Sequence, residues 1–448
     1  MQRRLISGHS PYEPVVGFSR AVVDGTTVHV AGTAPIPPDG SPPPDGAYEQ
    51  AKLCLEIIGE ALGRAGSVLD HRFGAGDPYT LGVEEEYMIL DGESFDLVQH
   101  IDTVLAAVKG HELESQVNAE LMQSVLEIAT PVCRTAADVH EELSKLRAYV
   151  CGVARSNGLR VGSAGTHPFS LFERQRITAR DRYHNLVDQM QYIARRELIF
   201  GLHMHVAVDN EEKAVKVVNG LLPHISQMLA LSASSPFWRG EPTGLASSRQ
   251  MVFSAFPRSG PPPRFENYTE FAEVVGQLER TGCIADYTHI WWDIRPHPRL
   301  GTIEIRVCDA VTMMEDAVAI AAYCQAMVKQ LAERHDAGEV LPSYHRILTS
   351  ENKWLAARYG LEAPIMDLAT GRRNRVPVAQ LVRRTLREIE PHARELGSER
   401  ELEGIRDLLA RGNGSDRQLR VWNANRDIVE VVRELAAATE IAAASAAA

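Results

Sequence analysis

The sequence predicts an α+β protein, in which a mixed or antiparallel sheet is backed by helices and a small β-β-α unit comes first. Short strand candidates alternate with helices, but without the regular rhythm of a doubly wound parallel sheet. A polar, glycine-containing stretch at residues 70–78 separates the first part of the chain from the rest. The 448 residues, 44% of them hydrophobic and 24% charged, have the composition of a globular protein with enough chain for a large core.

The β-β-α pattern occupies the first part of the chain. Two β-branched runs lie on either side of Asp24-Gly25, a dipeptide that marks a tight hairpin turn. The two runs span residues 15–23 and 26–33. Residues 48–62 repeat apolar side chains at helical spacing. We therefore expect a β-β-α unit over residues 1–70 and a linker over residues 71–78.

The remaining elements follow from residue 79 onward. Strand candidates are apolar or alternating runs at residues 80–90, 125–129, 160–163, 198–208 and 301–309. Helix candidates show apolar side chains at helical spacing, at residues 136–157, 182–196, 211–232, 315–337 and 378–395. The alanine-rich end, residues 439–448, is expected to fray because it lacks polar caps and an apolar stripe.

Composition excludes several classes of protein. The chain carries 59 Asp and Glu against 47 Lys and Arg, a net charge of −12, which is the wrong sign for coating nucleic-acid phosphates. No stretch approaches the ~18 uncharged apolar residues of a membrane span, and no apolar signal region follows the first arginines. The six cysteines form no C-x-x-C pair, so we expect reduced, buried thiols. A cytoplasmic protein without nucleic-acid or membrane partners is the expectation.

Three strand candidates carry polar residues two positions apart. Because side chains alternate along a strand, each pair shares one face of the sheet. The pairs are Glu84 and Glu86 in LGVEEEYMIL, His203 and His205 in FGLHMHVAV, and Glu304 and Arg306 in GTIEIRVCD. Polar side chains inside apolar strands are costly unless their face lines a solvated or metal-filled cavity. Each pair alone also fits an ordinary solvated face or an ion pair, but together they predict three strands that converge on one funnel floor.

A fourth segment, ESQVNAELMQSVLEIATPV, adds Glu120 and Glu127, seven residues apart. A helix would place both side chains on one face, whereas a plain strand would place them on opposite faces. Because residues 125–129 look like a strand, a turn or bulge after Glu120 is needed to direct both inward. A surface amphipathic helix without a function is the alternative that the pattern leaves open.

Six blocks, in order, resemble the YbdK-type carboxylate-amine ligases of the glutamate-cysteine ligase type 2 family. The blocks are GVEEEYMIL, ELMQSVLEIATPVC, GSAGTHPF, FGLHMHVAV, ASSRQMVFSAFPRSGPPP and WWDIRPHPRLGTIEIRVCDA. They extend over about four fifths of the chain. The resemblance implies one ligase domain over residues 79–438 with a glutamine-synthetase-like fold, a funnel of largely antiparallel sheet backed by helices, often in a homodimer.

The resemblance also implies ATP-dependent joining of a carboxylate to an amine through an acyl phosphate. The usual carboxylate is the γ-carboxyl of glutamate, and the amine belongs to an amino acid such as cysteine. This encounter of anions needs divalent cations, Mg²⁺ or Mn²⁺, and cationic side chains at the transferred phosphoryl group. By likeness to the family, one metal would be held by Glu86, Glu120 and Glu127 and another by Glu84, His203 and Glu304. Arg306 would stabilise the charge at the γ-phosphoryl group.

Five further residues are candidates for binding ATP or substrate. Arg249 in ASSR and Arg295 in DIRP are fork-shaped donors suited to a substrate carboxylate, although an arginine beside prolines also caps loops. His167 and Trp292 lie in blocks that look like binding loops. His205 is either a ligand or a partner that orients a carboxylate.

The first 70 residues resemble the first half of a RidA/YjgF protein, a family of compact trimers that deaminate enamines and imines. The second half of that fold, which supplies the catalytic arginine, is missing, so we do not expect an active deaminase. A half fold also leaves an unpaired sheet edge.

Two other functions compete with the ligase. His203 and His205 with a glutamate would suit a zinc hydrolase, which leaves the other acids and Arg306 unexplained. A RidA-like fragment joined to a degenerate ligase domain would make a non-catalytic amino-acid sensor or scaffold.

Overall fold

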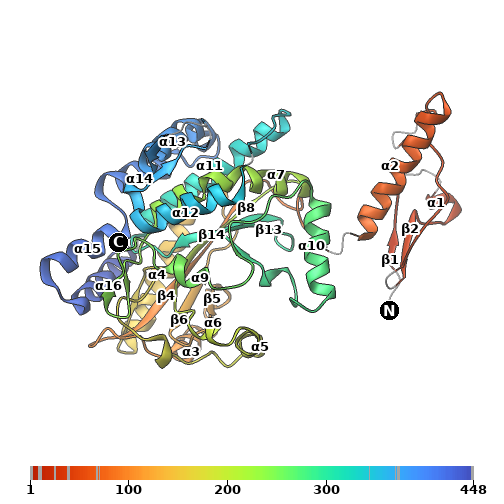
Figure 1. Ribbon diagram of the computed structural model, residues 1–448. Coiled ribbons are helices and arrows are strands. Elements are labelled where there is room, and N and C mark those ends of the chain that lie inside the picture. The colour runs from red at the N-terminus through yellow and green to blue at the C-terminus, as the bar shows by residue number, and fades with distance from the viewer. Residues whose placement is uncertain are drawn as a thin grey trace. The chain divides into compact units, whose positions relative to one another are not determined.

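The computed structural model describes residues 4–8, 13–24, 27–37, 41–66, 69, 71–342, 344–368, 370 and 374–444 (Figure 1). The chain divides into two compact units. The smaller comprises Met1–His71 and Phe265–His289, and the larger comprises Arg72–Arg264 and Ile290–Ala448. Over the described ranges, no helix has the combination of length and apolar character that crossing a bilayer requires.

The smaller unit contains a three-stranded antiparallel sheet. Its strands are β1 (Arg4–Ile6), β2 (Ala21–Asp24) and β3 (Thr27–Val30), in that order, and its helices are α1 (Glu13–Val16), α2 (Ala47–Gly66) and α10 (Tyr268–Arg280). The predicted hairpin and the helix after it are confirmed, although Gly25 of the turn lies outside the described residues. The first run does not begin as a strand at residue 15, because Pro14 favours the first turn of a helix and Gly17 follows with a φ of 73°.

The larger unit is built on a seven-stranded sheet in which all the paired strands are antiparallel. The order is β13-β14-β8-β4-β6-β5, and β7 also pairs with β4. Its strands are β4 (Leu81–Asp91), β5 (Val117–Ala119), β6 (Val125–Ala129), β7 (Leu159–Gly162), β8 (Gly201–Ala207), β13 (Ile294–His297) and β14 (Thr302–Asp309). All five predicted strands are present, and the α+β prediction is confirmed.

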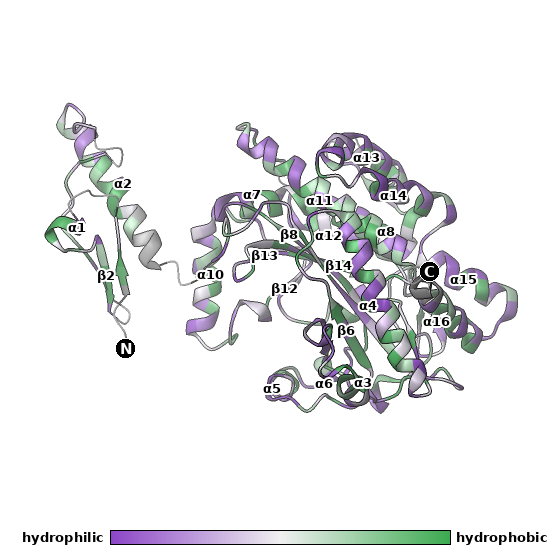
Figure 2. Cartoon of the chain, turned by 180° about the vertical axis from the view of Figure 1, so that it is seen from behind, coloured by the Kyte–Doolittle hydropathy of each residue, from purple (hydrophilic) through white to green (hydrophobic). Residues whose placement is uncertain are grey.

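Helices cover one face of this sheet. They are α4 (Ala136–Ser156), α7 (Glu211–Leu221), α8 (Ile225–Ser232), α11 (Met314–Asp336) and α16 (Ile428–Ala444). Hydrophilic residues predominate on the outer helices α13 (Val378–Glu395) and α14 (Glu399–Arg411), whereas α8 is largely apolar (Figure 2). The core therefore lies between the sheet and the inner helices, which leaves the opposite face of the sheet for polar side chains.

A buried ion pair joins the sheet to its helices. Arg147 on α4 is fully buried and bonds both oxygens of Glu85, at 2.5 Å from Nη2 and 2.9 Å from Nε. The Tyr87 hydroxyl also donates to Glu85. Glu85 thus points toward the helices, and alternation along β4 directs Glu84 and Glu86 to the other face. The predicted division of these three glutamates between the two faces is confirmed.

Two predicted helices are interrupted. The helix expected over 182–196 is divided into α5 (Asp181–Met190) and α6 (Tyr192–Arg195), because Gln191 adopts a φ of 50° between them. The helix expected over 211–232 is divided into α7 and α8 by a short turn that contains Pro223, whose ring is incompatible with a helix interior.

Several elements were not predicted. In addition to α1, α10, α14 and α16, they include the helices α3 (Ile101–Val108), α9 (Arg249–Phe253), α12 (Arg346–Tyr359) and α15 (Gly414–Asn425). Small two-stranded sheets pair β9 (Phe237–Trp238) with β10 (Glu241–Pro242), β11 (Ser259–Gly260) with β12 (Trp291–Trp292), and β15 (Pro364–Met366) with β16 (Arg375–Pro377).

The expectation of a frayed tail from residue 439 is wrong as far as Ala444, where α16 ends. Thr439 is fully buried and accepts a hydrogen bond from the Ser163 backbone N–H at 3.1 Å. Glu440 binds Arg160 through both oxygens, at 2.6 and 2.9 Å. An apolar stripe on α16, comprising Val431, Val432, Leu435 and Ala436, is buried in the core. Residues 445–448 lie outside the described residues.

Candidate active site

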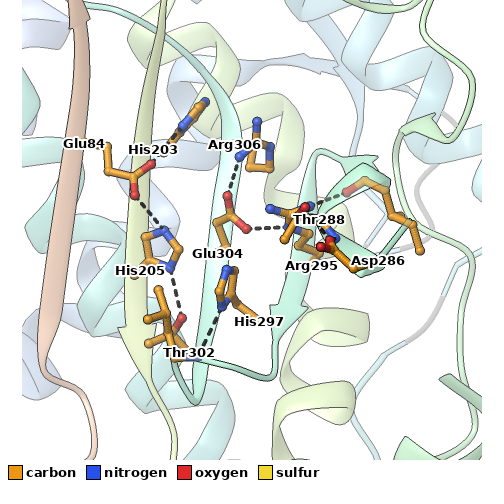
Figure 3. A network of polar contacts seen from close by, with 12 residues as sticks. Glu84, His203, His205, Asp286, Thr288, Arg295, His297, Thr302, Glu304 and Arg306 are labelled. Atoms are coloured by element: carbon orange, nitrogen blue, oxygen red, sulfur yellow. Dashed lines mark hydrogen bonds and ion pairs between the residues drawn. The ribbon is translucent and has the colours of Figure 1, made fainter. Parts of the chain in front are cut away.

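The predicted polar pairs meet on the sheet face that lies away from the helices. Strands β14, β8 and β4 are neighbours, so their polar residues form rows across the sheet. The register pairs Glu84 with His203, Glu86 with Glu127, and Glu304 with both His205 and Arg295. Figure 3 shows Glu84, the two histidines, Glu304 and the two arginines directed toward one another.

Glu84 lies between the two histidines. Its carboxylate is 3.3 Å from His203 Nδ1 and 3.5 Å from His205 Nε2. Burial raises the pKa of Glu84, but hydrogen bonds with both histidines outweigh it and bring the pKa below its ordinary value. Burial, together with the charge of Arg306, lowers the pKa of His203 to about 4, so its imidazole is neutral at pH 7. The other nitrogen of His205, Nδ1, lies 3.0 Å from the Thr302 hydroxyl.

Glu304 lies between two arginines. One carboxylate oxygen bonds Arg295 Nε and the other bonds Arg306 Nη1. Burial raises the pKa of Glu304, but the charges of both arginines outweigh it and hold the pKa well below its ordinary range. Arg295 also donates to the Ile290 carbonyl at 2.6 Å. Arg295, which we predicted to bind a substrate carboxylate, is therefore engaged by Glu304.

A second group of acids lies on β4 and on the β5-β6 hairpin. Burial and the charge of Glu120 raise the pKa of Glu86 to about 7, although Glu86 accepts the Gly201 backbone N–H at 2.5 Å. Burial and the same neighbour raise the pKa of Glu127 well above its ordinary value, and burial raises that of Glu120. Glu120 follows β5 in the turn that leads to β6, so the required turn is present and the alternative of an amphipathic helix is wrong.

The donor set of this face suits a hard divalent cation. The neighbouring carboxylates Glu86, Glu120 and Glu127 repel one another in a buried position, and a cation would relieve that repulsion. His203 Nε2 is buried and has no hydrogen-bond partner among the described residues. However, among the residues that the structure describes, no group of three or more His, Cys, Asp or Glu side chains is arranged to hold a metal ion. The metal-binding roles of the six residues therefore stay predictions, as does the competing zinc site.

Arg249 lies beside His203, at the start of α9. A Cβ atom on Gly201 would lie 2.6 Å from Arg249 Nη2 and 2.7 Å from His203 Nε2, so only glycine leaves room for both side chains. The Arg249 guanidinium donates to the carbonyls of Arg306 and Val307 over 3.3 and 3.4 Å. Its Nε is buried without a partner among the described residues.

The loop that presents Arg249 is anchored by Asp309, which sequence reasoning missed. One carboxylate oxygen accepts from the Ser235 hydroxyl at 2.7 Å and the other from the Ser247 hydroxyl at 2.8 Å. The Ser235 hydroxyl in turn accepts the Arg249 backbone N–H at 3.1 Å. Asp309 is fully buried at the end of β14, and only this tertiary contact reveals its role.

His167 and Trp292 are placed differently from what we expected. His167 is buried, and its Nδ1 accepts the backbone N–H groups of Phe169 and Ser170 at 3.2 and 2.9 Å. Its Nε2 lies 3.0 Å from the Phe95 carbonyl, so both ring nitrogens are occupied and the contacts indicate a structural role. Trp292 is buried in β12. A substrate role for either residue stays a prediction, which the contacts of His167 do not support.

A family model and several relatives of known sequence all match this chain to the same family. The model of glutamate-cysteine ligase family 2 (GCS2) matches residues 80–436. A protein of Rubrobacter xylanophilus named "Putative glutamate--cysteine ligase 2-1" is 42% identical over 79% of this chain and 93% of its own length. Another from the same organism, "Putative glutamate--cysteine ligase 2-3", is 44% identical over 83% of this chain and 100% of its own length. A relative from Sorangium cellulosum, named "Putative glutamate--cysteine ligase 2", is 42% identical over 80% of this chain and 95% of its own length.

Two solved structures share the fold. The glutamate-cysteine ligase of Francisella tularensis in complex with AMP has a TM-score of 0.58 at 13% identity, over 83% of this chain and 93% of that one. A bifunctional glutathione synthetase from Pasteurella multocida has a TM-score of 0.58 at 16% identity, over 82% of this chain and 52% of that one. The family match begins at residue 80, so the RidA resemblance of the first 70 residues stays a prediction.

Proposed function

The chain belongs to glutamate-cysteine ligase family 2 and is a glutamate-cysteine ligase-like enzyme, and on this premise we propose that it joins a carboxylate to an amine through an acyl phosphate made with ATP. The observation that carries the proposal is the pairing of two charge environments on one sheet face. Acids with raised pKa values lie on β4, in the turn between β5 and β6, and on β6, whereas arginines surround Glu304 on β14. The first environment suits cations, and the second suits a phosphoryl group.

The acids would hold the metal ions that ATP brings. Glu86, Glu120 and Glu127 would bind one ion, and Glu84, His203 and Glu304 would bind another, Glu304 through an oxygen that it shares with an arginine. A divalent ion held there, Mg²⁺ or Mn²⁺, would offset the negative charge of the phosphates. Because its pKa is held low by burial and by Arg306, His203 is a neutral imidazole and has a lone pair available as a donor. Thr302 fixes His205, which in turn orients Glu84 from the other side.

Arg306 would stabilise the transferred phosphoryl group. Glu304 holds its Nη1, its Nε is buried without a partner among the described residues, and 15% of the side chain is exposed. A guanidinium that is fixed on one side and open on the other can offer N–H donors where negative charge develops. Since Arg295 is already paired with Glu304, Arg249 is the better candidate for the substrate's own carboxylate.

The proposed reaction has two steps. An oxygen of the reacting carboxylate, which we propose is the γ-carboxyl of glutamate, attacks the γ-phosphorus of ATP, and ADP leaves. The nitrogen of an amine, such as the α-amino group of cysteine, then attacks the acyl carbon, and inorganic phosphate leaves with the electrons of the broken C–O bond. The predicted homodimer is not needed for either step and stays a prediction.

The proposal is tested by incubating the protein with ATP, Mg²⁺, glutamate and a panel of amino acids and other amines. We expect ADP release that requires both the carboxylate and an amine, and a product whose mass equals their sum less one water. ADP release that is independent of every carboxylate and amine tested would contradict the proposal, as would the absence of ATP turnover with any of them.

A further inference from the structure

Glu197 is a buried carboxylate that none of the proposed roles uses. It follows α6 and lies four residues before β8, the strand that carries His203. The residue as a whole is only partly buried, yet both carboxylate oxygens are shielded from solvent and have no hydrogen-bond partner among the described residues. A buried, ionised carboxylate without a partner is costly, so one is usually kept for a ligand or for catalysis.

The surroundings of Glu197 place it at the site. The charged groups that act on it most strongly are Arg249, Glu86, Arg196 and Arg306. Arg249 itself lies over Gly201, whose N–H is bound by Glu86. Burial raises the pKa of Glu197 to about 8. The charge of Arg249 lowers this pKa, whereas repulsion from Glu86 raises it further. The three arginines do not offset the effect of burial, so the pKa of Glu197 lies close to neutral pH, which suits a group that must both accept and release a proton.

The proposed reaction contains one cation without a receptor. The acceptor amine reaches the enzyme as an ammonium ion and must lose a proton before its nitrogen can attack. Phosphates meet Arg306 and the metal ions, and the substrate carboxylate meets Arg249, but none of these binds an ammonium group. Glu197 is the buried acid near the site whose two oxygens are both free of protein partners among the described residues.

We propose that Glu197 binds the amino group of the acceptor substrate beside Arg249 and accepts its proton. The inference rests on the proposed ligase function and adds the position of the acceptor. One N–H proton of the ammonium passes to a Glu197 oxygen, and the freed lone pair forms the C–N bond. The C–O bond of the acyl phosphate then breaks, and phosphate leaves with its electrons and takes up the second proton that the nitrogen loses on becoming an amide. The acceptor class is accordingly an amine that is protonated at neutral pH.

The test compares Glu197→Gln with the wild-type enzyme on two acceptors. Both reactions contain ATP, Mg²⁺ and glutamate, or the carboxylate that supports ADP release, and the acceptor is either the amino acid found in the panel or hydroxylamine. Hydroxylamine is uncharged at neutral pH, so it attacks an acyl phosphate without a receptor for an ammonium ion. Glu173→Gln is the matched control, because Glu173 is an exposed glutamate whose partner is the surface residue Arg239.

We expect Glu197→Gln to reduce amide formation at least about 100-fold, the lower end of what a positioned proton acceptor contributes. Hydroxamate formation and the KM for ATP should stay within about threefold of the wild-type values, which shows that folding and acyl activation are intact. The Glu173→Gln control should resemble the wild type with both acceptors.

Two results would overturn the inference while the ligase function stands. In one, Glu197→Gln loses hydroxamate formation as severely as amide formation, which would place Glu197 with the metal ions or the structural core. In the other, the variant retains amide formation. A wild-type enzyme that forms neither product would instead overturn the proposed function, and the inference with it.

Discussion

Two kinds of carboxylate share the sheet face of the site. Glu84 and Glu304 have protein partners, two histidines in one case and two arginines in the other, and their pKa values are low. Glu120 is the strongest charged neighbour of both Glu86 and Glu127, and burial together with its charge raises their pKa values. The alternation of side chains along a strand was enough to predict which of these residues share a face. The partners of Glu304 and the isolation of Glu197 depend on which segments approach in three dimensions, so the sequence pattern carried no signal of them.

The raised pKa of Glu86 predicts a pH dependence of stability. Burial, together with Glu120, raises it from 4.5 to about 7, so the folded state binds the proton more tightly than the unfolded state does. The stability that this group contributes is therefore complete below the unfolded pKa and is lost as the pH rises through about 7. Without divalent cations, Glu86→Gln should become more stable than the wild type as the pH rises, by at most about 3 kcal/mol.

Chemical denaturation between pH 4.5 and 8 in a chelating buffer measures this difference. The control is Glu93→Gln, a substitution of an exposed glutamate in the turn after β4. A wild-type protein whose stability relative to Glu86→Gln is the same at both ends of the range would contradict the assignment of Glu86 to an uncompensated acidic cluster.

At the scale of elements, the strands were easier to predict than the loops that join them. Every predicted strand of the larger unit is present, because a short run of apolar or alternating residues that is bounded by turns identifies a strand from local sequence. The loop of Ser247, Ser248 and Arg249 is positioned by Asp309 instead, 60 residues from Arg249 in the chain (309 − 249). The end of the chain was also misjudged, since α16 buries its apolar stripe against segments far away in the sequence.

The role of this loop predicts a specific defect for Asp309→Asn. The amide can no longer accept hydrogen bonds from both serine hydroxyls and the Ser234 backbone N–H, so the loop loses its anchor. We expect the KM for the substrate carboxylate to rise at least about tenfold, a loss of about 1.4 kcal/mol, while the KM for ATP changes little. Steady-state kinetics with each substrate varied in turn measure the difference.

Asp188→Asn is the matched control, because Asp188 is an exposed residue of α5. Equal increases in both KM values for Asp309→Asn, or no increase in either, would contradict a positioning role for Asp309 through Arg249.

At the scale of the whole molecule, the family match covers residues 80–436 and does not include the first 70 residues. Relatives are matched over 93 to 100% of their own length by about four fifths of this chain. The order of the sequence blocks was sufficient to predict the family and the fold. Chain length was not, because about 150 residues per domain would have suggested three domains. The carboxylates that we assign to metal ions contribute to the net charge of −12, and bound cations would offset part of that charge.

Because the family match begins at residue 80, we predict that β1 to β3 and the helices α1 and α2 are dispensable for turnover. A variant without residues 1–66 ends its deletion at the last residue of α2 and keeps His71, whose ring packs edge-on against Tyr268 at 5.2 Å. We expect its kcat and its KM for ATP to lie within about threefold of the full-length values. A loss of activity from a variant that is folded by circular dichroism would instead assign the N-terminal unit a part in the reaction.

The acyl phosphate is the central claim, and one isotope measurement tests it most directly. Glutamate labelled with ¹⁸O in its γ-carboxyl group, or the labelled form of whichever carboxylate the enzyme uses, is converted with ATP and an amine, and the released phosphate is analysed by mass spectrometry. The account predicts ADP and one ¹⁸O atom in each phosphate, because the carboxylate oxygen that attacks phosphorus leaves with it. Unlabelled phosphate, or label transferred to AMP, would contradict it.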